Sequence, residues 1–323
     1  MKITVLGAGA FGTALARLLC ENGQEVRLWG HSQKHIETLQ ATRVNDRHLP
    51  GFPFPETLHL TQELDLSDAE LALFAVPSQA MREVAERAKG FKGIAVSVTK
   101  GLEHDTGLTM CGILREVLDV SVAALSGPSL ARELAKGIPA AVVAASEDDS
   151  AGRLVQQAFH RNTFRVYRGN DLRGVEMGGA LKNVIAIGAG ACDGLGFGDN
   201  SKAALVTRAI AEIRRLGEAH GAQADTFAGL SGLGDLTVTC FSKLSRNRGF
   251  GERIGAGEDP ARLLAEADHV VEGHPTSRSA YRLARNLGVE TPIIDEVYAM
   301  LHEGKPLNQA IQDLIGREAK VED

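Results

Sequence analysis

The first twelve residues constrain the fold more than any other segment of the chain. An apolar, β-branched run, Ile3–Leu6, leads directly into the pattern Gly-x-Gly-x-x-Gly at Gly7, Gly9 and Gly12. The Ala- and Leu-rich stretch Thr13–Cys20 that follows has helical periodicity. Between a strand and a helix, Gly7 makes the tight turn, Gly9 lets the backbone approach a pyrophosphate, and Gly12 lets helix and strand pack closely. The pattern predicts a dinucleotide-binding unit. A glycine-rich turn without a ligand is the alternative.

Size and charge restrict the class of protein. With 323 residues, the chain is long enough for two domains. Its hydrophobic content of 44% and charged content of 24% are ordinary for a soluble globular protein. The formal net charge of -6 gives no electrostatic reason to expect nucleic acid or an acidic membrane as a partner.

The cysteines and the apolar stretches indicate a compartment. Cys20, Cys111, Cys192 and Cys240 lie far apart and form no Cys-x-x-Cys pair. This spacing argues against a zinc site or a disulfide framework and fits a reducing cytoplasm. No basic-then-apolar leader precedes the first strand, and charge or glycine interrupts every apolar stretch short of a membrane span. We therefore expect a cytoplasmic protein with no metal site and no stable membrane insertion.

The chain changes character near its middle. The first half alternates β-like runs with helical segments, which is typical of a parallel α/β sheet. The predicted strands are Ile3–Leu6, Glu25–Trp29, Leu71–Val76, Ile94–Val98, Ser121–Leu125, Ala140–Ala144 and Thr163–Tyr167. The segment Asn45–Pro55 contains three prolines and is predicted to be a surface loop.

After about Arg168 the strand patterns disappear. The predicted helices are Asp171–Ala189, Lys202–His220, Arg262–Glu266, Thr276–Leu287, Ile294–Leu301 and Pro306–Gly316. Asp171 is a candidate N-cap, and Gly221 and Gly288 stand where helix-ending glycines belong. We expect an α/β fold with a Rossmann-type, doubly wound, mostly parallel sheet over residues 1–169 and an all-helical domain over residues 170–323.

The end of the second predicted strand bears on the choice of dinucleotide. Ligands of open α/β sheets lie beyond the carboxyl ends of the strands, and an NAD-selective site usually places an acid after the second strand. Here Trp29-Gly30-His31-Ser32 carries no acid to repel a 2′-phosphate. We interpret this as acceptance of NADPH, with His31 and Ser32 near that phosphate. A surface turn that contacts only water is the alternative.

Two further strand ends offer candidate ligand contacts. Lys100 closes the predicted strand Ile94–Val98, where its ammonium could reach both a cofactor and an anionic substrate. A snorkelling surface lysine is the alternative. Ser126–Glu133 follows another strand, with Ser129 as the predicted cap of a helix and backbone N–H groups facing the cleft. An ordinary βα connection would explain the same residues.

The helical half contains a candidate acid/base. Gly178 and Gly179 are adjacent within a predicted helix, where two glycines in place of alanine lower helix stability by about 1–2 kcal/mol. We therefore expect another element to approach that backbone closely. Lys182 follows one turn later among apolar residues, and a desolvated lysine near another cation can act as a general acid/base. A solvated helix lysine is the competing interpretation.

Two later motifs could complete such a site. Gly229–Leu236 predicts a close-packed turn that presents Asp235. Ser245–Arg248 combines guanidinium, amide and hydroxyl donors, which suits a phosphate monoester because a guanidinium binds phosphate oxygens in pairs. A basic, solvated helix end is the alternative.

Taken together, these motifs resemble the NAD(P)-dependent sn-glycerol-3-phosphate dehydrogenases of the bacterial type. The resemblance covers nearly the whole chain in the right order. It is carried by Gly7–Leu15, Thr99–Gly101, Ser126–Ser129, Ala180–Asn183, Gly232–Leu236, Ser245–Asn247 and Val270–Gly273. It implies a second domain of the 6-phosphogluconate dehydrogenase-like kind. It also implies reversible reduction of dihydroxyacetone phosphate with NADP(H) or NAD(H), which supplies glycerol phosphate for phospholipid synthesis, in a possible homodimer.

The resemblance also implies residue roles. Lys182 would be the catalytic proton donor and acceptor. The substrate would contact Lys100, Gly127, Ser129, Lys182, Asp235, Ser245, Arg246 and Asn247. The cofactor would contact Gly7, Gly9, Ala10, Phe11, Gly12, His31, Lys100, Ala131, Arg246, Val270 and Glu272.

The chain departs from the family pattern at three positions. Family members often carry Ser at the place of Ala10, Tyr or Trp at Phe11, and Arg at Ser32. The last departure weakens the expected NADPH preference, because an arginine binds a 2′-phosphate better than a serine. Two other functions fit part of the pattern. One is a reductase of the 6-phosphogluconate or hydroxyacid type, which would need carboxylate recognition. The other is a non-catalytic nucleotide sensor, which would not need Lys182 and Asp235.

Overall fold

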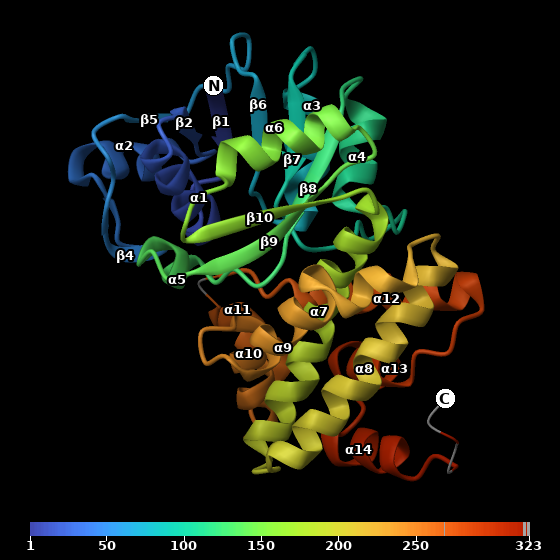
Figure 1. Cartoon of the computed structure of the whole chain (residues 1–323). Helices are drawn as coiled ribbons and strands as arrows, with labels where there is room; N and C mark the ends of the chain where they lie inside the picture. Colours follow the sequence, from blue (N-terminus) through green and yellow to red (C-terminus); the bar gives the residue numbers. More distant parts are fainter. Residues whose placement is uncertain (268, 319–320, 322–323) are drawn as a thin grey trace.

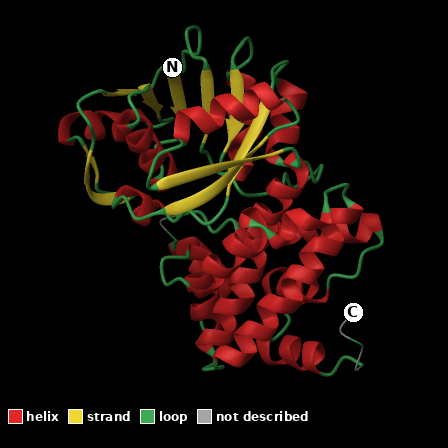
Figure 2. Ribbon diagram, in the orientation of Figure 1, coloured by secondary structure: helices red, strands yellow, loops and turns green. Residues whose placement is uncertain are grey.

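The computed structural model describes residues 1–267, 269–318 and 321 (Figure 1). Strands occupy one end of the molecule, and the other end is helical (Figure 2). The main sheet is built from β1 (Lys2–Leu6), β2 (Glu25–Trp29), β5 (Leu58–Thr61), β6 (Leu71–Phe74), β7 (Ile94–Ser97), β8 (Val122–Ser126), β9 (Ala140–Ala145) and β10 (Phe164–Gly169). The predicted α/β class and the separate helical half are confirmed.

The sheet has the order β10-β9-β8-β7-β6-β1-β2-β5. All neighbouring strands are parallel except β8 and β9, which are antiparallel. The order reverses direction between β1 and β6, since β2 follows β1 on one side and β6 continues on the other. In a doubly wound sheet the ligand crevice lies at this switch point, beyond the carboxyl ends of the strands.

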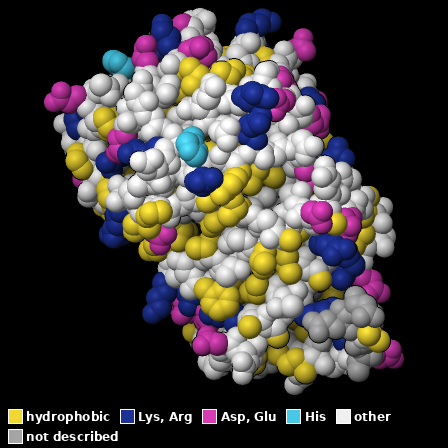
Figure 3. Space-filling view, in the orientation of Figure 1, with side chains coloured by type: hydrophobic (Ala, Val, Ile, Leu, Met, Phe, Trp, Pro, Cys, Tyr) yellow, Lys and Arg dark blue, Asp and Glu magenta, His cyan; other side chains and the backbone are white. Residues whose placement is uncertain are grey.

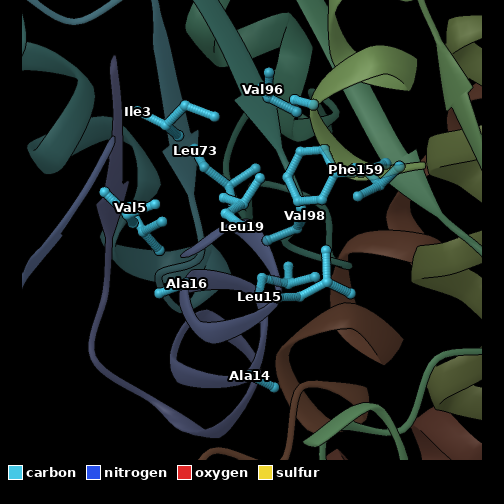
Figure 4. Packing of buried hydrophobic residues seen from close by; sticks show 14 of the residues in the cluster. Ile3, Val5, Ala14, Leu15, Ala16, Leu19, Leu73, Val96, Val98 and Phe159 are labelled. Atoms are coloured by element: carbon cyan, nitrogen blue, oxygen red, sulfur yellow. The ribbon is translucent and has the colours of Figure 1, made fainter. Parts of the chain in front are cut away.

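Both faces of the sheet are buried, because successive side chains of a strand point to opposite sides. The helices of this half are α1 (Ala10–Glu21), α2 (Gln33–Thr42), α3 (Met81–Arg87), α4 (Met110–Val117), α5 (Ala131–Ala135) and α6 (Asp149–Phe159). Leu73 of β6 packs with Leu15 of α1 and Phe159 of α6 (Figure 4), whereas Phe74 packs on the opposite side with α3 and α4. The apolar strand runs follow from this two-sided burial.

The predicted surface loop Asn45–Pro55 is wrong. It holds most of an antiparallel hairpin made of β3 (Val44–Asn45) and β4 (Leu49–Pro53). The fully buried Asn45 donates from Nδ2 to the carbonyl oxygen of Ala8 at 2.9 Å and to Thr13 Oγ1 at 2.8 Å. The prolines misled the prediction because they are tolerated in an edge strand. The hairpin therefore forms a wall beside the glycine turn.

The helical half comprises α7 (Leu172–Gly194), α8 (Asp199–Ala219), α9 (Asp235–Phe241), α10 (Arg246–Gly255), α11 (Pro260–Glu266), α12 (Gly273–Leu287), α13 (Pro292–His302) and α14 (Leu307–Ile315). The six predicted helices are present, while α9 and α10 were not predicted as helices. Asp171 caps α7 by accepting a hydrogen bond from the Gly174 N–H, and Gly288 ends α12 with φ +66°, both as predicted.

Helix α7 joins the two halves. Its first residues, Leu172 and Val175, pack in the core of the sheet domain, and its remaining turns contact α8, α9, α10, α12 and α13. Along its flank, a Cβ at Gly190 would lie 1.9 Å from the Arg248 carbonyl oxygen, and one at Gly194 would lie 2.1 Å from that of Glu252. Glycine is therefore required where α7 and α10 touch. The chain's division at residues 169 and 170 stays a prediction.

Within residues 1–267 and 269–318, no helix combines the length and apolar character that a membrane crossing needs.

Candidate active site

The turn between β1 and α1 has the geometry expected of a pyrophosphate cradle. Gly7 has φ +122°, and a Cβ there would lie 2.4 Å from the Ala75 carbonyl oxygen. A Cβ at Gly12 would lie 2.0 Å from the Gly7 carbonyl oxygen, whereas a Cβ at Gly9 would meet no atom within 4 Å. Gly7 and Gly12 thus serve the turn and the packing, and Gly9 borders open space. The first N–H groups of α1 have no side-chain cap and face that space.

The centre of the site is Asp235, which bridges a lysine from each half of the molecule. Its carboxylate is buried at the start of α9. The Lys182 ammonium, on α7, donates to Oδ1, and the Lys100 ammonium, just beyond β7, donates to Oδ2 at 2.6 Å. Lys100 also donates to the Gly127 carbonyl oxygen at 3.0 Å. The two predicted lysines and the predicted aspartate therefore converge across the domain boundary.

The environment changes the acidity of Lys182. The side chain is buried, and this desolvation, opposed by the Asp235 charge and aided by the Lys100 charge, lowers the Lys182 pKa to about 8. The ammonium also donates to Thr239 Oγ1 at 2.8 Å. Since an ammonium has three N–H groups, one remains for a ligand. A lysine with these properties can exchange a proton with a substrate near neutral pH.

The glycine turn and the lysines are neighbours. The Lys100 ammonium lies 6.0 Å from the centroid of the Phe11 ring, in the first turn of α1. Because Phe11 stands only two residues after Gly9, the lysines lie close to the turn on which a dinucleotide would bind. Through Lys100 and Asp235, the glycine turn of the sheet domain and Lys182 of the helical domain are thus brought together.

The adjacent glycines of α7 are explained by close approach, as predicted. A Cβ at Gly178 would lie 2.6 Å from the carbonyl oxygen of Ser231, within a π-helical turn formed by Leu230–Gly234. A Cβ at Gly179 would lie 2.8 Å from Ser126 Oγ at the end of β8. The backbone of α7 is thus pressed between the sheet and the turn that presents Asp235.

An asparagine network fixes the position of Lys100. Asn183 Nδ2 donates to the Lys100 carbonyl oxygen at 3.0 Å, and Asn247 Nδ2 donates to Asn183 Oδ1 at 3.0 Å. Asn247 Oδ1 accepts from the Gly273 N–H at 2.9 Å. The Asn247 side chain is therefore largely used within the protein. Its predicted contact with the substrate phosphate fits its backbone N–H better than its side chain.

The start of α10 has free donors for an anion. Ser245 caps this helix by accepting from the Arg248 N–H, and the first-turn N–H groups of Arg246 and Asn247 have no helical acceptor. Arg246 is exposed, yet the surrounding protein lowers its guanidinium pKa, while the nearby Glu272 charge opposes that shift.

Glu272 connects the helical domain to the strand ends. Its carboxylate accepts from the Ser78 N–H at 3.0 Å and from Ser78 Oγ at 2.6 Å. Ser78 follows β6, and a Cβ at Gly101, just beyond β7, would lie 2.6 Å from Ser78 Cβ. Desolvation raises the Glu272 pKa, and the Ser78 hydrogen bonds oppose that shift.

The remaining predicted residues lie around this centre. Ser129 is not the cap of α5, because Leu130 holds that position and Ser129 Oγ instead donates to the Gly127 carbonyl oxygen at 2.9 Å. Ala131 begins α5, His31 is exposed beyond β2, and Val270 is exposed before α12. Among the described residues, no hydrogen bond or ion pair links these three to the lysine pair, so their cofactor roles stay predictions. Ser32 caps α2 by accepting from the His35 N–H.

Apolar side chains gather between the two halves of the molecule (Figure 3). An open groove lies beside the site. Its lining includes Glu133 from α5 together with Leu230, Gly234 and Phe241 from the helical half. Gly234 immediately precedes Asp235, so the groove adjoins the site from outside.

Three residues of the site were not among the predicted contacts: Ser78, Asn183 and Thr239. Ser78 stands two residues after the predicted strand Leu71–Val76, and Asn183 belongs to the motif Ala180–Asn183, so position gives a signal for both. Thr239 stands one helical turn after Asp235 and could have been found from that spacing.

Known proteins resemble this chain over nearly its whole length. Residues 2–152 match the family described as NAD-dependent glycerol-3-phosphate dehydrogenase N-terminus, and residues 171–312 match its C-terminus. A glycerol-3-phosphate dehydrogenase (NAD(P)+) of Geobacter sp. strain M21 is 47% identical over 330 residues, covering 99% of this chain and 98% of the relative. One from Chlorobium phaeobacteroides is 47% identical over 331 residues, covering 100% and 99%.

Solved structures agree with this result. A glycerol-3-phosphate dehydrogenase from Coxiella burnetii superposes with a TM-score of 0.95 at 39% identity, covering 98% of this chain and 99% of that one. A D-mandelate dehydrogenase with NADH superposes with a TM-score of 0.63 at 13% identity, covering 94% and 97%, and shares the fold alone.

Proposed function

The chain belongs to the NAD-dependent glycerol-3-phosphate dehydrogenase family, and from this premise we propose how its residues act in the reaction. The enzyme interconverts dihydroxyacetone phosphate and sn-glycerol 3-phosphate with NAD(P)H. Family membership excludes the nucleotide sensor and the hydroxyacid reductase considered from the sequence. The observation that carries the residue assignment is Asp235, held between Lys100 of the sheet domain and Lys182 of the helical domain.

The residues around the glycine turn fit a dinucleotide. Of the three glycines in the turn, Gly9 is the one that borders free space, and the N–H groups at the start of α1 have no side-chain cap there. We assign the pyrophosphate to these N–H groups and the reactive ring to the neighbourhood of Lys100. When bound, the dinucleotide supplies or accepts the hydride at the central carbon of the substrate.

Lys182 is the general acid of ketone reduction and the general base of alcohol oxidation. Its one uncommitted N–H can hydrogen-bond the substrate oxygen that gains charge as the carbonyl is reduced. With a pKa of about 8, it is mostly protonated at neutral pH and can donate that proton. Asp235 orients the ammonium. Lys100, with its own third N–H, adds positive potential at the same oxygen.

The phosphate of the substrate binds at the start of α10. The Arg246 guanidinium and the N–H groups of Arg246 and Asn247 all belong to the first turn of this helix, and the helix dipole and the cation both favour an anion there. Because Asn247 is also linked through Asn183 to Lys100, this end of the substrate is held in register with the reacting end.

The enzyme accepts NADPH, because no acid follows β2. The proposal is supported by the exposed His31 and by Ser32, whose side chain caps α2. Ser32→Asp tests it, since aspartate preserves the cap and adds a charge that repels a 2′-phosphate. We expect kcat/KM for NADPH to fall about tenfold or more while that for NADH is unchanged. An unchanged ratio of the two would refute the assignment.

The product supplies the backbone for glycerophospholipid synthesis, and the enzyme works in the cytoplasm. The free thiols of Cys20, Cys111, Cys192 and Cys240 fit a reducing compartment. The homodimer implied by the family resemblance stays a prediction, and sedimentation velocity measures it directly.

The primary test is oxidation of NADPH in the presence of dihydroxyacetone phosphate, with unphosphorylated dihydroxyacetone as the control. We expect turnover of the phosphorylated ketone and little of the control, because the start of α10 recognises the phosphate. Equal turnover of both ketones would refute the phosphate site.

A further inference from the structure

Ser78 makes the most direct hydrogen-bonded link between the strand ends and the residues that we assign to the cofactor. It is buried at the end of β6, between the glycine turn after β1 and Lys100 after β7. This is the switch point of the sheet, where a bound dinucleotide passes. Both the N–H and the hydroxyl of Ser78 donate hydrogen bonds to the carboxylate of Glu272, which lies 194 positions away in the sequence.

The geometry leaves Glu272 with capacity for a ligand. Each carboxylate oxygen accepts one hydrogen bond from Ser78, Oε1 from the N–H and Oε2 from the hydroxyl. Because a carboxylate oxygen can accept two, each keeps one free lone pair. A carboxylate only accepts, so the partner must be a donor, such as a ribose hydroxyl or a carboxamide N–H of the nicotinamide half.

The surrounding chain is shaped around this pair. Gly101 has no room for a side chain, since a Cβ there would lie 2.6 Å from Ser78 Cβ, 2.9 Å from Ser78 Oγ and 3.4 Å from Glu272 Oε2. On the other side, Glu272 precedes Gly273, whose N–H is held by Asn247, and lies near Arg246. The Ser78–Glu272 pair thus connects the cofactor end of the crevice to the phosphate end.

We propose that Ser78 is a positioning residue that holds the Glu272 carboxylate across the domain boundary in the orientation that binds the nicotinamide half of the cofactor. The inference rests on the proposed contact between Glu272 and the cofactor. Two hydrogen bonds from one residue fix both the position and the rotation of the carboxylate. Losing the hydroxyl removes the stronger bond and lets the carboxylate turn toward solvent or Arg246.

The test is a double-mutant cycle with Ser78→Ala and Glu272→Ala, read as the Kd of NADPH and as KM and kcat. We expect Ser78→Ala to raise the Kd and KM for NADPH about tenfold, the usual effect of losing one hydrogen bond to a charged group. The KM for dihydroxyacetone phosphate should stay within about twofold. In the Glu272→Ala background, Ser78→Ala should change the Kd by less than about twofold, because no carboxylate is left to position.

Ser146→Ala is the matched control. Ser146 is equally buried in the sheet domain, and its hydroxyl donates to the Val122 carbonyl oxygen at 2.7 Å, away from Glu272. It should lower the melting temperature to a similar extent without changing the Kd of NADPH.

The outcomes separate the inference from its premise. If Glu272→Ala leaves the Kd of NADPH unchanged, the proposed cofactor contact of Glu272 is wrong and the inference falls with it. If Glu272→Ala weakens binding but Ser78→Ala does not, only the positioning role of Ser78 is refuted. Equal effects of Ser78→Ala with and without Glu272 would mean that Ser78 acts by another route.

Discussion

Replacing Asp235 with asparagine tests the electrostatics of the site most directly. The change preserves the shape of the side chain and removes the one negative charge between the Lys100 and Lys182 ammonium groups. At an effective dielectric constant of about 20, a charge pair about 4 Å apart is worth about 4 kcal/mol. Since a pKa unit corresponds to about 1.4 kcal/mol, this sets an upper limit of about three units on the resulting fall in the Lys182 pKa.

Water entering the variant site reduces this effect, so we expect the Lys182 pKa to fall by about two units, from about 8 to about 6. Ketone reduction requires protonated Lys182, so kcat/KM for dihydroxyacetone phosphate falls as pH rises through this pKa. Alcohol oxidation requires the free amine and shows the opposite slope. In Asp235→Asn both transitions should therefore move about two pH units toward acid.

Asp235→Asn should also change how the free energy of unfolding depends on pH. A lysine whose folded pKa is below its unfolded value of 10.5 binds fewer protons when folded, so the free energy of unfolding increases with pH between the two values. In the wild type this window runs from about 8 to 10.5, and in Asp235→Asn it should begin near 6. Urea unfolding at several pH values measures it.

Asp193→Asn is the matched control. Asp193 also lies between two cations of the helical domain, Lys202 and Arg248, but it stands eleven residues beyond Lys182 on α7, about 16 Å along the helix. It should lose stability without moving the pH–rate transition. A transition in Asp235→Asn that stays in place or moves toward alkaline pH would refute the reasoning.

Three further changes test other parts of the structure. Lys182→Ala should lower kcat about 10²- to 10⁴-fold and leave the Kd of NADPH unchanged, as measured by steady-state kinetics and a binding titration. A kcat close to that of the wild type would contradict the role of Lys182. Arg246→Ala should raise the KM for dihydroxyacetone phosphate about tenfold or more, whereas Arg253→Ala, on the exposed side of α10, should not; equal KM values would contradict the phosphate site. Glu212 is buried against the first N–H groups of α13, and desolvation raises its pKa to about 7 from 4.5. The wild type should lose about 3 kcal/mol of stability between pH 4.5 and 7, a loss that Glu212→Gln should remove in urea unfolding.

The parts of the fold that were predictable are those set by local sequence. Gly7 and Gly12 are fixed by sterics within the βα turn, and the apolar strand runs follow from burial on both faces of the sheet. The hairpin around Asn45 was not predictable, because its stability comes from the contacts of Asn45 with Ala8 and Thr13, far away in the sequence. Local signals there, chiefly prolines, favour a loop.

The site divides in the same way. Gly178 and Gly179 predicted that another element approaches α7 closely, and Lys182 was predicted to lie one turn later among apolar residues. The structure agrees, since Lys182 is buried. The residues that approach Gly178 and Gly179, which are Ser231 and Ser126, could not be predicted from the sequence, since each comes from a different element. The pairing of Ser78 with Glu272 likewise depends on how the two domains dock, and no local pattern encodes it.

The glycine contacts along α7 limit how this enzyme can change. Positions 178, 190 and 194 admit no methyl group, so the helix that bears Lys182 has no freedom to slide or rotate against its neighbours. The packing of α7 therefore fixes the position of the Lys182 amine. New ketone preferences, in laboratory evolution or in descent, must therefore arise from substitutions at other side chains around the substrate, while the amine stays where the backbone holds it.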